Sequence, residues 1–385
     1  MWNKDFIILL LINSATGISF QILAPNLPVY AQHQLGFSES MIGFLAASLA
    51  FGALLSRPFA GPLVDTLNRK KINIFSLLMM SAAVLSLNWA SSPAVLIGIR
   101  FLHGVLFGIN STVSTTMASM ATPEGKMGQG IGIYSITGIG AQAIAPALGI
   151  TIAARWGYPT LFICAACISA LVSPLPLALS ERVVLRKEKT ADSAKKGFSV
   201  KKLPTPNILA FALLAVFYTG VTSSVTNFMV LYGMGKGISN VGFYFTLFAL
   251  VIIAIRLTSG SLTDRHPFQR ILYPCSACCA LALLTISWAD SFMILAVAAV
   301  FMGVGYGMAF PTVQAVSIRA AEPENRGQAV AIVYSGSDLA HCFGPIVMGF
   351  LVEALGYSQG FRVMCFAMLA TVPVIFFLSS GKRAR

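Results

Sequence analysis

The segment GPLVDTLNRKK (61–71) lies between two long apolar runs, and a shorter version of it, GSLTDR (260–265), lies between two others. About 200 residues separate the two segments, a spacing that indicates an internal duplication. Further pairs at this spacing, or one residue more, are Arg57 with Arg256, Gly61 with Gly260, Leu63 with Leu262, Asp65 with Asp264, Gly104 with Gly303, Gly108 with Gly307, Gly128 with Gly327, Gln129 with Gln328, Pro123 with Pro323, Glu124 with Glu324, Tyr134 with Tyr334 and Ser135 with Ser335. So many coincidences predict two halves of the same architecture.

Apolar runs continue on both sides of each copy. About twelve of them approach the roughly 20 residues that a helix needs to cross a bilayer. They are 5–30, 40–62, 72–90, 93–118, 128–153, 159–180, 207–232, 239–262, 270–288, 291–318, 328–353 and 357–380. We therefore expect an all-α membrane protein whose twelve transmembrane helices form two pseudo-symmetric six-helix bundles. The bundles are 1–180 and 207–385, and a linker, 181–206, joins them.

Composition agrees with lipid as the main solvent. Hydrophobic residues make up 56% of the chain and charged residues only 10%, whereas a soluble domain carries about 25% charged residues. The net charge of +13 could suggest nucleic-acid binding, but the basic residues lie in short gaps between spans, where they set topology. The seven cysteines all fall in apolar segments, so we expect packing roles, no cofactor and no metal.

The basic residues predict the orientation. With the N-terminus inside, most of the 26 Lys and Arg residues fall at the cytoplasmic side; the exceptions are Arg155, Lys236, Arg362 and Arg100. Because cytoplasmic loops are enriched in these residues, both termini and the basic loop 181–206 should be cytoplasmic. The loop itself reads as a solvated linker. We expect the apolar N-terminal segment to be retained as the first helix rather than cleaved as a signal peptide, and the expected location is a bacterial inner (plasma) membrane.

At residues 61–71 the chain resembles the major facilitator superfamily, whose signature there is G-x-L-a-D-r-x-G-r-k; Thr66 and Asn68 depart from it. The resemblance extends over essentially the whole chain and implies a secondary transporter that works by alternating access, with no enzymatic activity. The residues to which it assigns gating are Arg57, Gly61, Asp65, Arg69, Lys70, Gly260, Asp264 and Arg265. The alternative is that Asp65 and Arg69 form a static surface pair.

Span four contains RFLHG (100–104), which is similar to the family motif R-x-x-q-G with His103 in place of Gln. Arg100 is a cation well inside an apolar span, where a charge is costly unless it is paired or hydrated. We interpret Arg100 and His103 as tuning a nearby proton-carrying group. The alternative is that Arg100 extends to the outer surface.

Span five contains AQAIAPALG (141–149), which partly matches a motif that the superfamily associates with efflux. Pro146 and Gly149 fit that motif, and Gly344 and Pro345 are their counterparts in span eleven. Proline among small residues bends a helix and permits close packing. The resemblance therefore favours export over uptake.

Asp338 in span eleven is the acid nearest the middle of a span, with His341 one turn later and Tyr334 one turn earlier. An intramembrane carboxyl is a candidate proton carrier, and histidine exchanges protons near neutral pH. The acid that exporters of this family carry in span one is absent, since that span offers only Asn13, Gln21 and Asn26. The alternative is that Asp338 and His341 only pack the helices together.

These observations predict proton-coupled export of a small molecule such as a drug, a metabolite or a metallophore. An importer or uniporter of a small polar nutrient and a non-transporting membrane sensor are the alternatives. A monomer in the bilayer is expected, with protons and a small-molecule substrate as partners and no nucleic acid. Candidate substrate-binding residues are Asn26, Asn110, Tyr218, Asn227, Phe310, Gln314 and Asp338.

Overall fold

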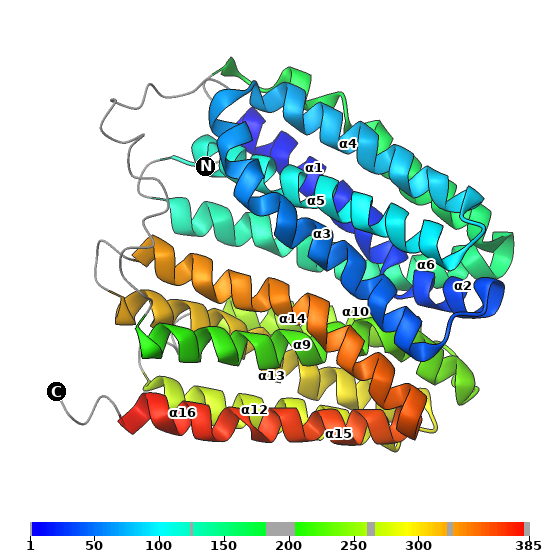
Figure 1. Cartoon of the computed structure of the whole chain (residues 1–385). Helices are drawn as coiled ribbons and strands as arrows, with labels where there is room; N and C mark the ends of the chain where they lie inside the picture. Colours follow the sequence, from blue (N-terminus) through cyan, green and yellow to red (C-terminus); the bar gives the residue numbers. More distant parts are fainter. Residues whose placement is uncertain (1, 124–125, 182–204, 260–265, 322–325, 381–385) are drawn as a thin grey trace.

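The computed structural model describes residues 2–123, 126–181, 205–259, 266–321 and 326–380 (Figure 1). These residues contain helices and no strand. The α-helices are α1 (Lys4–Leu23), α2 (Asn26–Leu35), α3 (Glu39–Thr66), α4 (Arg69–Leu85), α5 (Pro93–Ala121), α6 (Met127–Val172), α9 (Pro206–Gly235), α10 (Gly242–Ser259), α12 (Phe268–Ser287), α13 (Phe292–Ala320), α14 (Arg326–Leu355), α15 (Tyr357–Leu369) and α16 (Thr371–Ser380). Two short 3-10 helices, η1 (Ser86–Trp89) and η2 (Leu175–Ala178), follow α4 and α6.

The helices correspond to the predicted spans. Ten helical segments of the described residues are long and apolar enough to cross a membrane, and α10 is a shorter apolar helix. The longest, α6, leaves helical geometry at Gly157, whose φ of 80° suits a residue without a Cβ. Dividing α6 there, joining α1 to α2 and joining α15 to α16 leaves one helical stretch for each predicted span. The all-α membrane fold is thus confirmed.

Two predicted spans differ in detail. The first is interrupted at Ala24 and Pro25, because proline cannot donate the backbone hydrogen bond that would continue α1 into α2. The sixth was expected to run to residue 180, but its α-helix ends at Val172 and η2 follows.

Polar residues begin several helices. The side chain of Ser38 accepts a hydrogen bond from the Met41 amide at the start of α3, and Ser92 accepts one from Val95 at the start of α5. Asn68 accepts hydrogen bonds from the amides of Lys70 and Lys71. Such caps satisfy amides that have no partner inside the helix. Asn68, where the resembled signature prefers glycine, is therefore the N-cap of α4.

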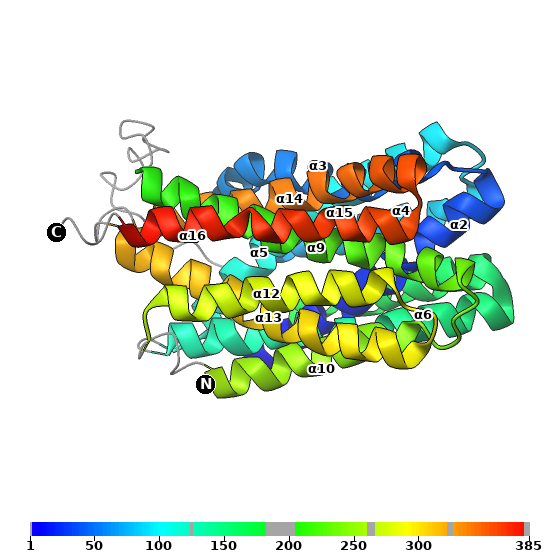
Figure 2. The ribbon, with the colours of Figure 1, turned by 90° about the horizontal axis from the view of Figure 1, so that it is seen from below.

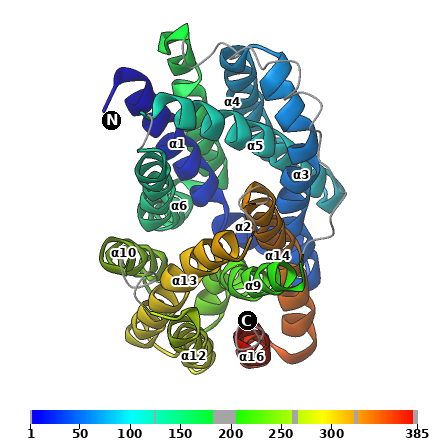
Figure 3. The same cartoon turned by 90° about the vertical axis from the view of Figure 1, so that its left-hand side faces the viewer.

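The helices form two bundles that lie side by side (Figure 3). One contains α1–α6 and the other α9–α16, and their helices run along a common direction (Figures 1 and 2). The bundles meet where α3 contacts α14 and where α6 contacts α10. Helix α1 begins and helix α16 ends at the same end of the molecule (Figure 1), and we call the opposite end the distal end.

Repeated glycines explain the close packing inside each bundle. A Cβ added at Gly104 of α5 would overlap the backbone of Leu49 on α3, and one added at Gly303 of α13 would lie 2.7 Å from the Val251 Cβ on α10. Helices can approach this closely only where a small residue stands at the contact. The equivalent spacing of Gly104 and Gly303 in the sequence therefore reflects equivalent contacts, α3 with α5 and α10 with α13.

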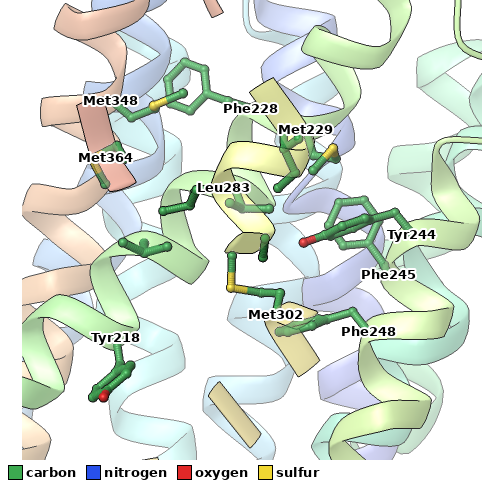
Figure 4. Packing of buried hydrophobic residues seen from close by; sticks show 14 of the residues in the cluster. Tyr218, Phe228, Met229, Tyr244, Phe245, Phe248, Leu283, Met302, Met348 and Met364 are labelled. Atoms are coloured by element: carbon green, nitrogen blue, oxygen red, sulfur yellow. The ribbon is translucent and has the colours of Figure 1, made fainter. Parts of the chain in front are cut away.

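The second bundle has a large apolar core. Buried aromatic and methionine side chains of several helices gather there, including Phe228 and Met229 of α9, Tyr244 of α10 and Met302 of α13 (Figure 4). Interdigitated side chains of this kind keep a bundle at the packing density of a solid. We expect the bundles to move as rigid bodies for this reason.

Candidate functional site: the contact between the two bundles

An ion pair joins the two bundles. Arg57 of α3 places its Nε atom 2.8 Å from Oδ2 of Asp338 on α14, and its Nη2 donates a hydrogen bond of 3.0 Å to Oδ1. A guanidinium that contacts both carboxylate oxygens makes the strongest and most directional kind of ion pair. It is the one ion pair whose two side chains the structure describes. The predicted proton carrier is thus the partner of a residue predicted to act in gating.

Helix packing sets the direction of Asp338. A Cβ added at Gly336 would lie 2.7 Å from the Ala212 carbonyl oxygen, and one at Gly344 would lie 2.5 Å from that of Gly220, so α14 is pressed against α9. An α-helix turns by about 100° per residue, so a residue two positions after Gly336 points to the opposite side of α14. Asp338 consequently faces α3.

The neighbours of Asp338 on α14 also make contacts of their own. The Nδ1 atom of His341 lies 2.9 Å from the backbone oxygen of Ser337, and the imidazole is exposed. Tyr334 is also exposed, and its ring meets that of Phe310 edge to face at 6.1 Å. The bidentate partner of Asp338 is Arg57, and sequence reasoning missed this pairing. The available signal was an arginine near the end of span two together with an acid inside span eleven.

Close backbone contacts join the bundles at the distal end. A Cβ added at Gly43 of α3 would lie 2.5 Å from the Pro345 carbonyl oxygen, and one at Gly349 of α14 would lie 2.5 Å from that of Glu39. The Glu353 carboxylate also accepts a 3.0 Å hydrogen bond from the Ser40 amide. The distal end is therefore closed in this structure along α3 and α14.

The second contact between the bundles has the same arrangement. Thr246 of α10 donates a 2.6 Å hydrogen bond to the Ala143 carbonyl oxygen of α6, and a Cβ added at Gly242 would lie 2.9 Å from the Ala147 Cα. Gly242 stands about 200 residues after Gly43, the spacing of the internal repeat. Both seams between the bundles are therefore built on a glycine at the distal end of an equivalent helix.

The residues near the signature loop are held inside the first bundle. Arg69 is buried, its Nε donates to the Val64 carbonyl oxygen at 3.2 Å, and its Nη1 lies 3.0 Å from the Met120 sulfur. Lys70 reaches the Leu177 carbonyl oxygen at 3.4 Å. Because Arg69 is buried, a surface pair is the wrong description of it. A Cβ added at Gly61 would meet nothing within 4 Å. The Asp65 side chain and residues Gly260, Asp264 and Arg265 lie outside the described part.

Arg100 and His103 of α5 contact each other inside the first bundle. The Nη1 atom of Arg100 lies 3.1 Å from Nδ1 of His103, and both side chains are buried. Because only 4% of Arg100 is exposed, the alternative in which it extends to the outer surface is wrong. Its Nε is buried and has no hydrogen-bond partner among the described residues.

The proline and glycine pairs predicted for efflux lie at helix contacts. Gly149 of α6 packs against Asn26 and the Ile22 carbonyl oxygen, at the break between α1 and α2. Gly344 contacts α9, and the carbonyl group of Pro345 faces Gly43 across the seam between the bundles. Pro146 lies inside α6. These residues thus stand where two helices approach each other, as a packing motif requires.

Three of the candidate substrate-binding residues have their hydrogen-bonding groups engaged within their own bundle. Asn26 donates to the Ile22 carbonyl oxygen at 2.7 Å, and Asn110 accepts from Asn73 at 2.8 Å. The Tyr218 hydroxyl lies 2.6 Å from the Ser276 Oγ. All three side chains are buried. These hydrogen bonds go to residues other than Asp338, and we interpret these side chains as structural contacts within the bundles.

Replacing Tyr218 by phenylalanine tests this interpretation. Tyr218→Phe removes a hydrogen bond from a buried cluster that also contains Ser276 and Thr371. It should lower stability by about 1–3 kcal/mol because the Ser276 side chain loses a partner. The melting temperature of the purified protein should fall while the affinity for substrate stays unchanged. Ser135→Ala, at an exposed hydroxyl of α6, serves as the control. A lower affinity for substrate at an unchanged melting temperature would show instead that Tyr218 contacts the substrate.

Among the remaining candidates, Phe310 is part of a row of aromatic rings. Phe310 of α13 stacks on Tyr306 at 5.9 Å and meets Tyr334 of α14, while Tyr306 also contacts Phe248 of α10 at 6.4 Å. Gln314, one turn after Phe310, is half-buried. Asn227 is half-buried as well, but it donates to the Ser223 carbonyl oxygen on its own helix. Phe310, Gln314 and Asp338 are therefore the candidates that we retain.

A lateral apolar cavity of about 790 Å³ opens beside the seam between the bundles. Residues of α3, α5 and α14 line it, among them Phe51 and Phe343, whose rings are exposed. Leu339, the neighbour of Asp338, is also part of the lining. In the described residues, no group of three or more His, Cys, Asp and Glu side chains is placed to hold a metal ion.

Comparisons with known proteins agree with this architecture. The chain is 25% identical over 388 residues to the multidrug resistance protein MdtG of Klebsiella pneumoniae (strain 342), covering 98% of this chain and 92% of the relative. The MdtG of Escherichia coli O9:H4 (strain HS) is 25% identical over 395 residues, covering 98% and 93%.

Solved structures with the same fold include a point mutant of the nucleoside transporter NupG, with a TM-score of 0.82 at 11% identity, covering 97% of this chain and all of that one. A bacterial homologue of the human lysosomal transporter Spinster, inward-facing and unoccupied, has a TM-score of 0.80 at 15% identity, covering 98% and 96%. The family model of the Major Facilitator Superfamily matches residues 9–321 and 241–385. The chain therefore belongs to the Major Facilitator Superfamily and is a multi-pass membrane transporter rather than an enzyme.

Proposed function

We propose that this transporter exports small molecules in exchange for protons, and that Asp338 carries the proton. The observation that carries the proposal is the ion pair between Arg57 and Asp338, which spans the two bundles. A carboxyl group at a contact that must open and close is suited to couple protonation to movement. The resemblance to MdtG, which is named a multidrug resistance protein, favours drug-like cargo and outward transport.

The ion pair gives a physical route for coupling. When Asp338 is ionised, it holds α14 to α3 through Arg57; when it is protonated, the charge attraction disappears. Because Arg57 is 42% exposed, water screens the pair, and we assign it about 1 kcal/mol or less. That is up to about a fivefold change in the population of two conformations. Protonation therefore biases the equilibrium, and bound substrate has to contribute the rest.

The ion pair between Arg57 and Asp338 is also suited to exchange of substrate for protons, because it can prevent the empty carrier from changing conformation. In an antiporter, the carrier that holds neither proton nor substrate must not change conformation. Ionised Asp338 together with Arg57 stabilises the distally closed conformation when both sites are empty. A proton or a substrate must then release the same pair, so the two ligands use it in turn. His341, an exposed neighbour on α14, is proposed to modulate this step, and Arg100 with His103 to tune it from α5.

At the end that carries the termini, the proposed gate consists of the signature loop and its copy. Asp65, with Gly61, Arg69 and Lys70, and Gly260, Asp264 and Arg265 in the second half would secure that end when the distal end opens. The two loops occupy equivalent positions in the internal repeat. Each is therefore proposed to hold together the helices of its own bundle at that end. The distally closed conformation would then correspond to an inward-facing carrier.

This correspondence requires the termini and the loop 181–206 to be cytoplasmic. In a variant without its native cysteines, a cysteine at the exposed position Thr205 should resist an impermeant thiol reagent in intact cells. A cysteine at exposed Ser91, near the distal end, should react. Both should react after the cells are permeabilised. Labelling of position 205 but not of position 91 in intact cells would reverse the orientation.

Transport by purified protein in vesicles tests the function as a whole. Candidate substrates are first selected from antibiotics, metabolites and metallophores by their effect on the melting temperature. An imposed pH gradient should drive uphill movement of a selected compound opposite to the proton flow, and collapse of the gradient should stop it. Movement in the same direction as protons would indicate an importer, gradient-independent equilibration a uniporter, and no flux of any binding compound a sensor.

A further inference from the structure

Arg256 of α10 has no counter-charge within the part of the chain that the structure describes. Its Nε atom is buried and has no hydrogen-bond partner among the described residues. The one ion pair whose two side chains the structure describes is that of Arg57 with Asp338. Tyr306 on α13 and Tyr334 on α14 are its titratable neighbours, and neither is a carboxylate. A half-buried guanidinium with an unsatisfied donor is costly unless something else balances it.

The internal repeat shows what is missing. Arg256 is the counterpart of Arg57, which has Asp338 as its partner. Since Tyr134 aligns with Tyr334 and Pro146 with Pro345, the counterpart of Asp338 in the first bundle is Gly138 or Ile139. Neither side chain can supply a carboxylate.

The region of that missing carboxylate is open. A Cβ added at Gly138 or at Gly140 of α6 would meet no atom within 4 Å. The α6–α10 seam otherwise repeats the α3–α14 seam, with Gly242 against Ala147 as Gly43 is against Pro345. The α6–α10 seam therefore contains the arginine, Arg256, but no counterpart of the acid Asp338. Space is left beside Gly138 and Gly140, where that acid would stand.

We propose that Arg256 binds the anionic group of the transported substrate, a carboxylate or a phosphate-type group, which takes the place of the missing side-chain acid. This inference rests on the proposed function, since it names a chemical class for the cargo. A guanidinium recognises such groups through two parallel hydrogen bonds. Tyr306 and Tyr334 are neighbours of Arg256, and the ring of Phe310 contacts both of theirs. An aromatic acid therefore fits best.

Two matched probes test the proposal: 1-naphthoate and its neutral amide, 1-naphthamide, titrated into purified full-length protein in detergent by calorimetry. Wild type should bind the acid at least about 10-fold more tightly than the amide, because hydrogen bonds to a charged group are the strong ones. Arg256→Gln should remove this preference, and Arg256→Lys should keep part of it. Arg270→Gln, at an exposed arginine of α12, should leave it unchanged.

The melting temperature without ligand separates binding from folding. Arg256→Gln should melt at or above the wild-type temperature, because the substitution removes an uncompensated charge. Equal binding of acid and amide, binding of neither, an acid preference that survives in Arg256→Gln, or a lower melting temperature of that variant would each overturn the proposal. No proton gradient enters this assay, so its failure leaves proton-coupled export standing, and a failure of proton coupling leaves the anion site standing.

Discussion

Asp338→Asn is expected to reduce transport driven by a pH gradient to the level of protein-free vesicles. Asparagine keeps the shape of the side chain and can still accept a hydrogen bond from Arg57, but it cannot release a proton. The substitution therefore removes the proton carrier and the charge attraction to Arg57, while it leaves the shape of the side chain almost unchanged. Uphill movement should be lost, whereas downhill exchange of labelled substrate across the same vesicles should persist.

Glu353→Gln provides the matched control for this variant. Glu353 is an exposed carboxylate on the same helix, and it also bonds across the seam, to the Ser40 amide. Its substitution should retain most of the gradient-driven flux. If Asp338→Asn concentrated substrate as well as Glu353→Gln does, the proton would have to travel by another group. Loss of substrate binding itself would make Asp338 a counter-ion for cationic cargo.

Gly43→Leu should abolish transport for a different reason. Any side chain at this position meets the Pro345 carbonyl oxygen at 2.5 Å and the Ile346 Cα at 3.0 Å. Because these are backbone atoms, they cannot move away by a change of rotamer. Overpacking of this kind destabilises the contact by about 1–3 kcal/mol. Only the distally closed conformation bears that cost, so its population should fall by about 5-fold to 150-fold.

The measurement is the accessibility of the distal end together with flux. In Gly43→Leu, a cysteine facing the distal seam should react faster with an impermeant reagent while transport stops. Gly132→Leu is the control, since a Cβ at Gly132 meets nothing within 4 Å, and it should transport normally. Normal flux in Gly43→Leu would mean that the bundles need not close tightly along α3 and α14.

Some features of the fold were predictable because they depend on local chemistry. Apolar runs of membrane-spanning length gave the helices, and the repeated pair of Gly104 and Gly303 marked equivalent helix contacts. Serine or asparagine before a span gave caps, as at Ser38 and Asn68. The break at Pro25 was less predictable, because a proline inside a membrane helix can bend it without ending it.

The site was harder to predict, because it depends on how the helices are rotated about their axes. Arg57 and Asp338 are 281 residues apart, and nothing in either segment specifies that they face each other. Asn26, Asn110 and Tyr218 illustrate the opposite error. A polar side chain in a span can line a cavity or bond to its own bundle, and the sequence shows the residue but not its partner. Arg256 likewise stands out only in three dimensions, where its Nε lacks a partner among the described residues.

The central claim is that protonation of Asp338 controls the closure of the distal end. Spin labels at exposed positions Ser91 and Ser291, on the two bundles near that end, would report its width by pulsed electron resonance in a cysteine-free background. We predict short distances at alkaline pH and a longer population at acidic pH in wild type. Asp338→Asn should show the longer population at both pH values. The same response to pH in wild type and in Asp338→Asn would contradict the account.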